Sequence, residues 1–274
     1  MPTPPRVADV FDALATTYDQ TGMPFFRPVG ARLVEKLAPQ PGDQALDIGC
    51  GRGAVTVPLA RAVEHTGAVL AVDVSANMVA ATRDLVDHAG LGQVQVEVAD
   101  AADLGPRGTF DVVTASLVLF FLPDPAAALA SWLSLVADGG RLGCTTFGEL
   151  DEASHALDDL LVPYAPPGLL DPRTSGSLGP FSSADATRAL FQGCGADVQL
   201  TTEAFTLPFA DVADWERFSR TTGQSAMWRR VPDDDLPRLR AQAAKILDGP
   251  LVCGRSGSGP AVGDRPSRQP NQAW

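Results

Sequence analysis

The most informative stretch of the sequence is Leu46-Asp47-Ile48-Gly49-Cys50-Gly51-Arg52-Gly53. It overlaps an apolar segment over 44–48 that is typical of a strand, and a helix is expected over 54–63. Three glycines in GxGxG spacing let the backbone turn sharply and approach a ligand closely. The amino end of the following helix offers N–H groups to an anionic group. The stretch therefore predicts a ligand site where a strand passes through a loop into a helix.

Strands and helices alternate on the carboxyl side of this stretch. Apolar or alternating segments predict the strands, and helical apolar spacing with Ser75 as a cap predicts the helices. The strands are expected at 68–72, 94–98, 110–115 and 141–147, and the helices at 75–88 and 126–136, with a turn at 138–140. Such alternation is typical of βαβ units, which form a parallel sheet covered on both faces.

The flanking segments follow a different pattern. Two helices are expected before the first strand, at 7–19 and 24–38. After Gly148 a mobile loop or lid is expected at 163–181, because this segment is rich in Pro, Gly and Ser. Around it we expect helices at 151–163, 183–191, 211–222 and 233–247 and a strand at 198–207. Residues 253–274 are poor in apolar residues and are predicted to be a disordered tail.

Composition and charge exclude several function classes. The chain has 274 residues, with 21 Lys and Arg against 33 Asp and Glu, for a net charge of −12. That balance argues against a nucleic-acid binder and against attachment to anionic membranes. The four cysteines have no close C-x-x-C spacing, so neither a disulfide framework nor a metal site is indicated. The amino terminus has no apolar leader, and we expect a cytoplasmic protein.

Two carboxylates indicate which ligand the glycine loop serves. Asp73 closes the second strand, 20 residues after Gly53, where a carboxylate can accept both hydroxyls of a ribose. Asp47 stands two residues before the first glycine, where it would repel a diphosphate and suit an amino group. S-adenosylmethionine carries an α-amino group and no phosphate. A nicotinamide dinucleotide, whose fingerprint is GxGxxG, stays open as an alternative.

With these motifs, the sequence resembles the class I S-adenosylmethionine-dependent methyltransferases, in particular small-molecule enzymes of the ubiquinone and menaquinone biosynthesis type. The resemblance covers roughly residues 7–250. Its motifs are LDIGCGRG at 46–53, AVDVSANM at 71–78, Asp100-Ala101, FDVVTASLVLFFLPDP at 110–125 and the turn at 138–142. It implies an α/β fold with a Rossmann-like, seven-stranded, mostly parallel sheet, an N-terminal helical cap over 1–40, a cofactor-binding core over 43–148, and a C-terminal lid and helical insertion over 149–252.

The resemblance also implies the cofactor-binding residues. Asp47 and the loop hold the methionine end, Asp73 binds the ribose, Val74 and Met78 enclose the adenine, and Asp100 accepts from its amino group. The full set is Tyr18, Asp47, Gly49, Cys50, Gly51, Gly53, Asp73, Val74, Met78, Asp100, Ala101, Ser116 and Leu117. For the acceptor we expect an aromatic lining of Phe25, Phe120, Phe121, Trp215 and Trp228.

The chain departs from the family pattern at two places. Phe120-Phe121 replaces a His-His pair found in many relatives, so a general-base histidine is missing and no catalytic residue is assigned. An already acidic phenol, an enol or a nucleophilic carbon would suit such a site. Leu251-Val252 would begin the last strand, but the segment 254–257 interrupts it, so this strand is expected to be short, displaced or absent.

The sequence thus predicts methyl transfer from S-adenosylmethionine to a small, hydrophobic or aromatic acceptor by O- or C-methylation, with S-adenosylhomocysteine as the product. The alternative is a methyltransferase-like protein that binds the cofactor but catalyses a rearrangement or cyclisation, or has a non-enzymatic role. No metal and no nucleic-acid partner is expected, and the protein should be a monomer or a homodimer.

Overall fold

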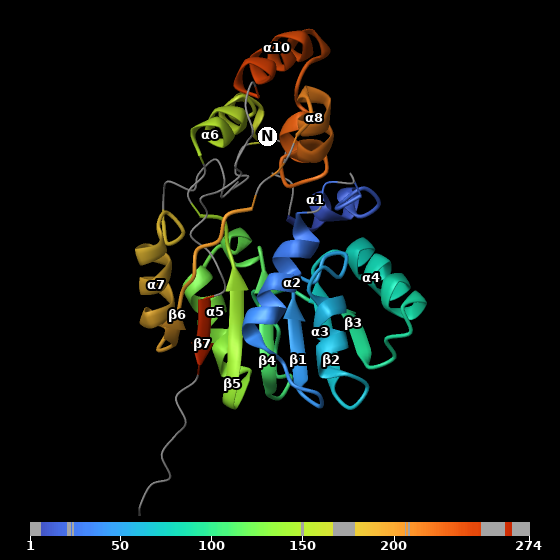
Figure 1. Ribbon diagram of the computed structural model, residues 1–274, viewed down its shortest axis with the longest axis vertical. Coiled ribbons are helices and arrows are strands. Elements are labelled where there is room, and N and C mark those ends of the chain that lie inside the picture. The colour runs from blue at the N-terminus through green and yellow to red at the C-terminus, as the bar shows by residue number, and fades with distance from the viewer. Residues whose placement is uncertain are drawn as a thin grey trace, which may run out of the picture.

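A twisted sheet and a separate layer of helices make up the molecule (Figure 1). The computed structural model describes residues 7–20, 23, 25–148, 151–166, 179–205, 207 and 209–247, and the backbone of 261–264. Five strands run parallel: β1 (Gln44–Ile48), β2 (Ala68–Asp73), β3 (Val94–Val98), β4 (Phe110–Ser116) and β5 (Val136–Thr145). The short strands β7 (Ala261–Asp264) and β6 (Asp197–Gln199) follow β5, so the order is β3-β2-β1-β4-β5-β7-β6.

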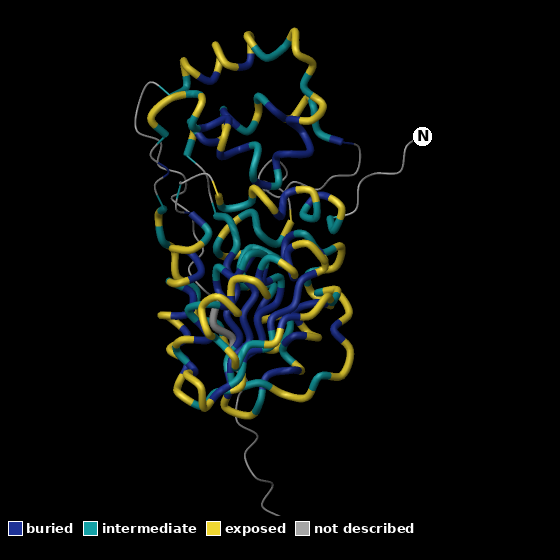
Figure 2. Tube along the Cα trace, turned by 90° about the vertical axis from the view of Figure 1, so that its right-hand side faces the viewer, coloured by how far each residue is buried: buried dark blue, intermediate teal, exposed yellow. Residues whose placement is uncertain are grey.

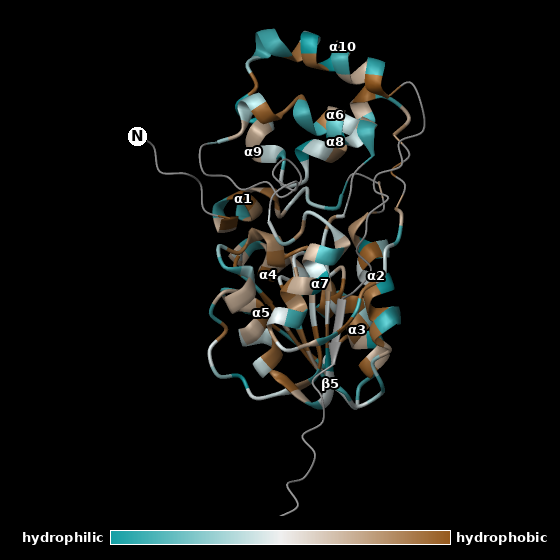
Figure 3. Ribbon diagram, turned by 90° about the vertical axis from the view of Figure 1, so that its left-hand side faces the viewer, coloured by the Kyte–Doolittle hydropathy of each residue, from teal (hydrophilic) through white to brown (hydrophobic). Residues whose placement is uncertain are grey.

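Helices cover both faces of the sheet (Figure 3), as the alternating sequence predicts. One face carries α2 (Phe26–Leu37), α3 (Thr56–Val63) and α4 (Ala76–His88), and the other carries α5 (Pro125–Ser134) and α7 (Ala184–Gly193). Neighbouring strand residues point to opposite faces. Val112 therefore packs with α2 and α3, whereas Val113 packs with α5 and α7. The buried strands lie between exposed outer helix surfaces (Figure 2).

A layer of helices stands over the carboxyl ends of the parallel strands (Figure 1). It contains α1 (Val7–Leu14), α6 (Glu152–Asp159), η2 (Val162–Tyr164), α8 (Val212–Arg220), α9 (Ser225–Trp228), η3 (Asp233–Asp235) and α10 (Leu236–Ile246). All of these except α1 come from the insertion after β5. They share a small core of their own, in which Leu161, Trp215, Met227 and Ala243 are buried together. The insertion thus packs as a unit that faces the strand ends.

The far edge of the sheet corrects two expectations. The prediction of a disordered tail over 253–274 is wrong at Ala261–Asp264, which form β7 between β5 and β6, antiparallel to both. A strand hydrogen-bonded on both sides is held by its backbone, so poor apolar content does not exclude it. The predicted strand 198–207 is also too long, because the pairing of β6 with β7 ends at Gln199. Residues 251–252 and 265–274, and most of the predicted lid (167–178), lie outside the described residues.

Two smaller differences concern element ends. β5 begins at Val136 and includes the predicted turn, because its register with β4 shifts between Phe110 and Val112 and Gly139 adopts a φ of +77°. α1 ends at Leu14 rather than near Asp19, which has a φ of +56° that a helix does not allow. Among the described residues, no helix combines the length and the apolar character that crossing a membrane requires.

Candidate active site

The loop after β1 brings the backbone close to an open space. Gly49 has a φ of +69°, and a Cβ atom there would lie 2.3 Å from Cγ2 of Val118, so only glycine fits. Gly51 has a φ of +51° and nothing within 4 Å of the position of a Cβ. The Gly51 N–H donates to Oδ2 of Asp73 at 2.8 Å, which fixes the loop against the end of β2. The two glycines therefore form a bare backbone wall.

Asp73 stands where the first two strands end. Its Oδ1 accepts from the Ser75 N–H at 2.9 Å, and its Oδ2 accepts from Gly51. Burial raises the pKa of this carboxyl, while the backbone hydrogen bonds from Ser75 and Gly51 oppose that rise. Each carboxylate oxygen has a second lone pair, so Asp73 can still accept hydrogen bonds from a ligand's hydroxyl groups.

A cavity of about 370 Å³ opens at this point, and we call it the strand-end cavity. It is lined by Val7, Ala8, Phe11, Tyr18, Gly49, Gly51, Asp73, Val74, Met78, Ala99, Asp100, Ala101, Ala102, Ser116, Leu117, Val118, Phe121, Leu122 and Pro123. Ten of the thirteen residues predicted for the cofactor are therefore brought together, and Phe121 of the predicted acceptor lining joins them. None of the described lining residues is Lys or Arg, so the cavity does not suit a phosphate.

The cavity has apolar walls beside its two carboxylates. Met78 is buried under α1, whereas Val74 is 37% exposed, an uncovered apolar side chain at the cavity's edge. Leu117 has a φ of +60°, which is uncommon outside glycine, and its N–H donates to the Thr145 carbonyl at 3.0 Å. This strained backbone at the end of β4 sets Leu117 against the cavity. A flat apolar group can therefore lie between these walls.

Three predicted cofactor residues lie behind the cavity wall. The Asp47 carboxylate is buried and accepts hydrogen bonds from Oγ1 of Thr56 at 2.6 Å and Oγ1 of Thr114 at 2.9 Å. Burial raises its pKa to about 6, although the threonine hydrogen bonds oppose the rise. Cys50 is buried with a raised thiol pKa, which excludes a reactive thiolate, and Gly53 lies outside the lining.

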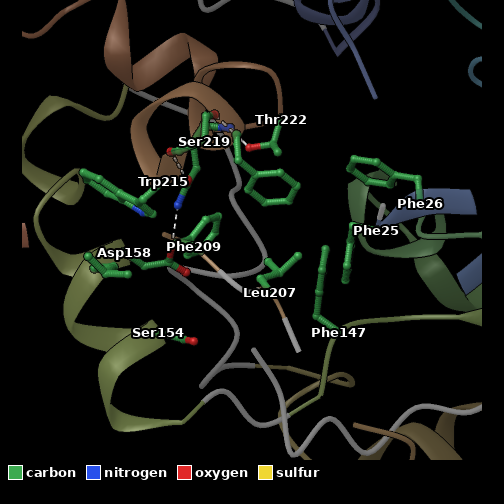
Figure 4. Close-up of a pocket in the computed structure, with 13 residues that line it drawn as sticks. Phe25, Phe26, Phe147, Ser154, Asp158, Leu207, Phe209, Trp215, Ser219 and Thr222 are labelled. Atoms are coloured by element: carbon green, nitrogen blue, oxygen red, sulfur yellow. Dashed lines mark hydrogen bonds between the residues drawn. The ribbon is translucent and has the colours of Figure 1, made fainter. Parts of the chain in front are cut away.

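A second cavity, of about 60 Å³, lies between the sheet and the insertion (Figure 4), and we call it the insertion cavity. Its lining is Phe25, Phe26, Phe147, Ser154, Leu157, Asp158, Leu207, Phe209, Trp215, Phe218, Ser219, Thr222 and Gln224. Phe25 and Trp215, both predicted for the acceptor, belong to it. The rings of Phe25 and Phe147 are parallel, with centroids 6.2 Å apart.

Aromatic rings connect the two cavities. Tyr18 of the strand-end cavity lies 4.5 Å, centroid to centroid, from Phe26 of the insertion cavity. Phe120 lies between Phe121 of the first cavity, at 4.7 Å, and Phe147 of the second, at 5.3 Å. The two cavities are thus adjacent, and they share a wall of rings.

Comparison with known proteins agrees with this geometry. The family model described as "Methyltransferase domain" matches residues 45–140. Nocamycin O-methyltransferase from Saccharothrix syringae is 47% identical over 253 residues, 87% of this chain and 88% of that protein. The chain belongs to the class I S-adenosylmethionine-dependent methyltransferases. Aklanonic acid methyltransferase DauC from Streptomyces sp. (strain C5) is 39% identical over 142 residues, which are 52% of this methyltransferase and 64% of that protein.

Solved structures support the fold of this methyltransferase. The YcgJ protein from Bacillus subtilis superposes with a TM-score of 0.58 at 16% sequence identity, covering 87% of this chain and 98% of that one. At that identity the likeness concerns the fold alone, and it confirms the predicted α/β, Rossmann-like class.

Two residues predicted for the methyltransferase's acceptor lie outside both cavities. Phe120 is buried within the wall of rings. Trp228 is buried next to Trp215, with centroids 5.4 Å apart, and its Nε1–H donates to Oγ of Ser219 at 2.7 Å. Trp228 faces the core of the insertion, which is the usual place of an aromatic residue at helical spacing.

Sequence reasoning missed several lining residues of this methyltransferase. The sequence does contain a signal for the α1 residues Val7, Ala8 and Phe11, because their amphipathic spacing predicts a helix with one apolar face. Asp158 and Gln224 have no such signal, because 66 residues separate these hydrogen-bonded partners. Only the three-dimensional packing of α6 against the turn after α8 brings them together.

Proposed function

We propose that this enzyme transfers a methyl group from S-adenosylmethionine to a small, hydrophobic or aromatic acceptor, by O- or C-methylation, and releases S-adenosylhomocysteine. The observation that carries the proposal is the strand-end cavity, which combines bare glycine backbone, two carboxylates and apolar walls without a described basic residue. The names of the two relatives, which refer to nocamycin and aklanonic acid, support a small-molecule acceptor.

The lining fits each part of this cofactor. In our proposal Asp73 accepts from the ribose hydroxyls, Val74 and Met78 enclose the adenine, and Asp100 accepts from the adenine amino group near the Ala101 backbone. Asp47 acts on the methionine end through its negative charge, while its oxygens hold Thr56 and Thr114. The remaining predicted residues serve the loop and the wall: Gly49, Cys50, Gly51 and Gly53 form the turn, and Tyr18, Ser116 and Leu117 enclose the methyl end.

The bound cofactor supplies an activated methyl group and its leaving group, so the chain's task is alignment and exclusion of water. Leu117 and Phe121 present apolar surface at the end of β4, and Tyr18 closes the cavity from the α1 side. The described residues of both cavities include no histidine to remove a proton from the acceptor. An acceptor that is already acidic, such as a phenol or an enol, or a nucleophilic carbon therefore suits this site best.

A calorimetric titration with S-adenosylmethionine, S-adenosylhomocysteine and NAD tests the cofactor. We expect micromolar binding of the first two, none of NAD, and an affinity loss of about a hundredfold in Asp73→Ala, because two charge-assisted hydrogen bonds disappear. The affinity of Asp73→Asn, which keeps one acceptor oxygen, should lie between those of wild type and Asp73→Ala. Asp84→Ala, an exposed carboxylate on α4, is the matched control and should bind as wild type. Equal affinities in Asp73→Ala and Asp84→Ala would contradict the assignment.

Mass spectrometry with S-adenosylmethionine and a panel of phenols and 1,3-dicarbonyl compounds tests the transfer. We expect products in which one methyl group replaces a hydrogen atom. Tight cofactor binding with no methylated product from any member would instead favour a rearrangement or cyclisation. A cytoplasmic location and a monomeric or homodimeric state stay predictions.

A further inference from the structure

The insertion cavity is chemically divided. Phe25, Phe26 and Phe147 form the side toward the sheet (Figure 4). All of the polar lining residues come instead from α6, α8 and the turn at 222–224. Among them, Asp158 carries the only charge in the described lining. A molecule in this cavity therefore meets rings at one end and a carboxylate at the other.

A series of hydrogen bonds ends on that carboxylate. Nε1 of Trp228 donates to Oγ of Ser219 at 2.7 Å, and the Ser219 hydroxyl donates to Oε1 of Gln224. Nε2 of Gln224 then donates to Oδ1 of Asp158. Every donor in the series points toward Asp158, so this residue is the terminal acceptor. Consecutive hydrogen bonds of this kind polarise one another in a buried setting.

The direction of the series fixes what the cavity can recognise. Ser219, Gln224 and Trp228 are all at least 96% buried, so they cannot reorient toward solvent. An ionised carboxylate only accepts hydrogen bonds, and each of its oxygens accepts more than one. A ligand group that reaches Asp158 must therefore be a donor. The rest of the lining is largely aromatic, which suits a hydroxyl on a ring better than a strongly hydrated ammonium group.

We propose that the insertion cavity selects the acceptor, and that Asp158 accepts a hydrogen bond from a hydroxyl on the edge of an aromatic acceptor. Asp158 is a specificity residue in this inference, distant from the methylated atom. The cavity of about 60 Å³ is less than half the ~150 Å³ that holds benzene, so it receives an edge of the acceptor rather than all of it. The inference rests on the proposed function.

Two small probes of matched shape test the inference by ¹⁹F NMR titration: 4-fluorophenol, and 4-fluorotoluene, in which a methyl group replaces the hydroxyl. Both are titrated with and without saturating S-adenosylhomocysteine. We expect wild type to bind 4-fluorophenol about tenfold more tightly, as a hydrogen bond to a charged group predicts. In Asp158→Leu the preference should vanish or reverse. Asp159→Leu, the same change at the exposed next residue of α6, should keep it.

Asp158→Asn gives a second test if the leucine variant does not fold. Its amide can still accept from Gln224, but the hydrogen bond that it makes with a ligand hydroxyl is neutral and therefore weaker. The preference of Asp158→Asn for 4-fluorophenol over 4-fluorotoluene should therefore be smaller than that of wild type. Equal binding of the two probes by wild type, no binding of 4-fluorophenol, or an unchanged preference in Asp158→Asn would each overturn the inference. Calorimetry of S-adenosylhomocysteine binding on the same samples distinguishes failure of this inference from failure of the proposed function, because only the latter would abolish that binding.

Discussion

Asp47 is the most deeply buried carboxylate among the described residues. It is only 1% exposed, lies at the end of the central strand, and is held by the hydroxyls of Thr56 and Thr114. Burial raises its pKa to about 6, from 3.8 in the unfolded chain, and the nearby charge of Asp73 adds to the rise. A raised pKa means that the folded protein holds the proton more tightly than the unfolded chain. Ionised Asp47 therefore costs stability.

We expect this cost to appear as a pH dependence of unfolding. The Asp47 contribution to the free energy of unfolding should fall as pH rises from about 4 to about 6, by up to about 3 kcal/mol, and stay constant above that range. Urea denaturation of wild type and Asp47→Asn across this range measures it. The asparagine cannot ionise, so the difference between the two proteins should change in favour of the variant as pH rises.

Wild type and Asp47→Asn differ only at this side chain, so a change with pH in the difference between them reports on the Asp47 carboxyl. A pH-independent difference for Asp47→Asn would contradict the assigned pKa.

At this scale the sequence predicts backbone sites better than side-chain contacts. The positions Gly49, Gly51 and Asp73 follow from local order, because a strand end, a turn and a helix start occur at fixed spacing. The contacts of Asp47 do not, since Thr114 comes from β4, 67 residues away. The same holds for Asp158 and Gln224, whose meeting depends on how the insertion packs.

At the scale of elements, the Asp12 side chain links α1 to the amino end of α4. Oδ1 of Asp12 accepts from Oγ of Ser75 at 2.5 Å and from the Asn77 N–H at 3.1 Å. Ser75 is itself the N-cap of α4 and accepts from Met78. A carboxylate is favourable at a helix amino end. Asp12 therefore holds α1, with its cavity-lining residues, over the strand-end cavity.

Asp12→Ala should loosen this attachment. We expect S-adenosylhomocysteine to bind about tenfold more weakly, mainly through faster dissociation, because a hydrogen-bonded charge is lost at the cavity's cover. Stopped-flow and calorimetric binding measure the two effects. Asp12→Asn keeps an oxygen that accepts from Ser75 and Asn77, and should retain most of the affinity. Equal dissociation rates in wild type and Asp12→Ala would show that α1 does not cover the bound ligand.

Within the insertion, Glu216 joins α8 to α10. Its carboxylate accepts from Nε of Arg240 at 2.8 Å and from Nε of Arg220 at 2.9 Å, and the hydrogen bond from Arg240 is the main cause of its lowered pKa. A lowered pKa gives stability that is present above about pH 4.5 and lost as pH falls through the folded value. Glu216 therefore stabilises the insertion at neutral pH.

Glu216→Gln should lower the free energy of unfolding by about 1–2 kcal/mol at pH 7, because the two arginines lose their shared anion. The difference should shrink as pH falls below 4.5, the ordinary pKa of this carboxyl. Hydrogen exchange should show the loss of protection in α8 and α10. Asp185→Asn on α7, where the carboxylate is 94% exposed, is the control and should change stability by less than about 0.5 kcal/mol. Equal effects of the two substitutions would contradict this role.

At the scale of the whole molecule, the sequence predicts the parallel half of the sheet more fully than its edge. β1 and β3 match their expected ranges, because buried parallel strands are continuous apolar or alternating runs. β7 breaks that rule, since Ala261–Asp264 lie in a segment rich in Gly, Pro and Ser. Its place depends on β5, which ends at Thr145, 116 residues before Ala261, and on β6, which ends at Gln199, 62 residues before it. No local pattern reports such pairing.

The position of β7 gives a prediction for the intact sheet. β6 pairs only with β7 in the described structure, and β5 uses its outer edge for β7 over Arg141–Cys144. Deleting residues 261–274 should therefore detach β6 and leave the edge of β5 unpaired. Because open strand edges associate, we expect a lower melting temperature and aggregation on heating. Thermal unfolding measures the first effect and light scattering the second. Deleting only 265–274 keeps β7 and should leave the melting temperature and the aggregation unchanged.

The strand-end cavity lies over β1, β2 and β4, so the longer deletion should still bind S-adenosylhomocysteine at low temperature, with an affinity within about threefold of wild type. If both deletions melted as wild type does, β7 would contribute nothing to the sheet.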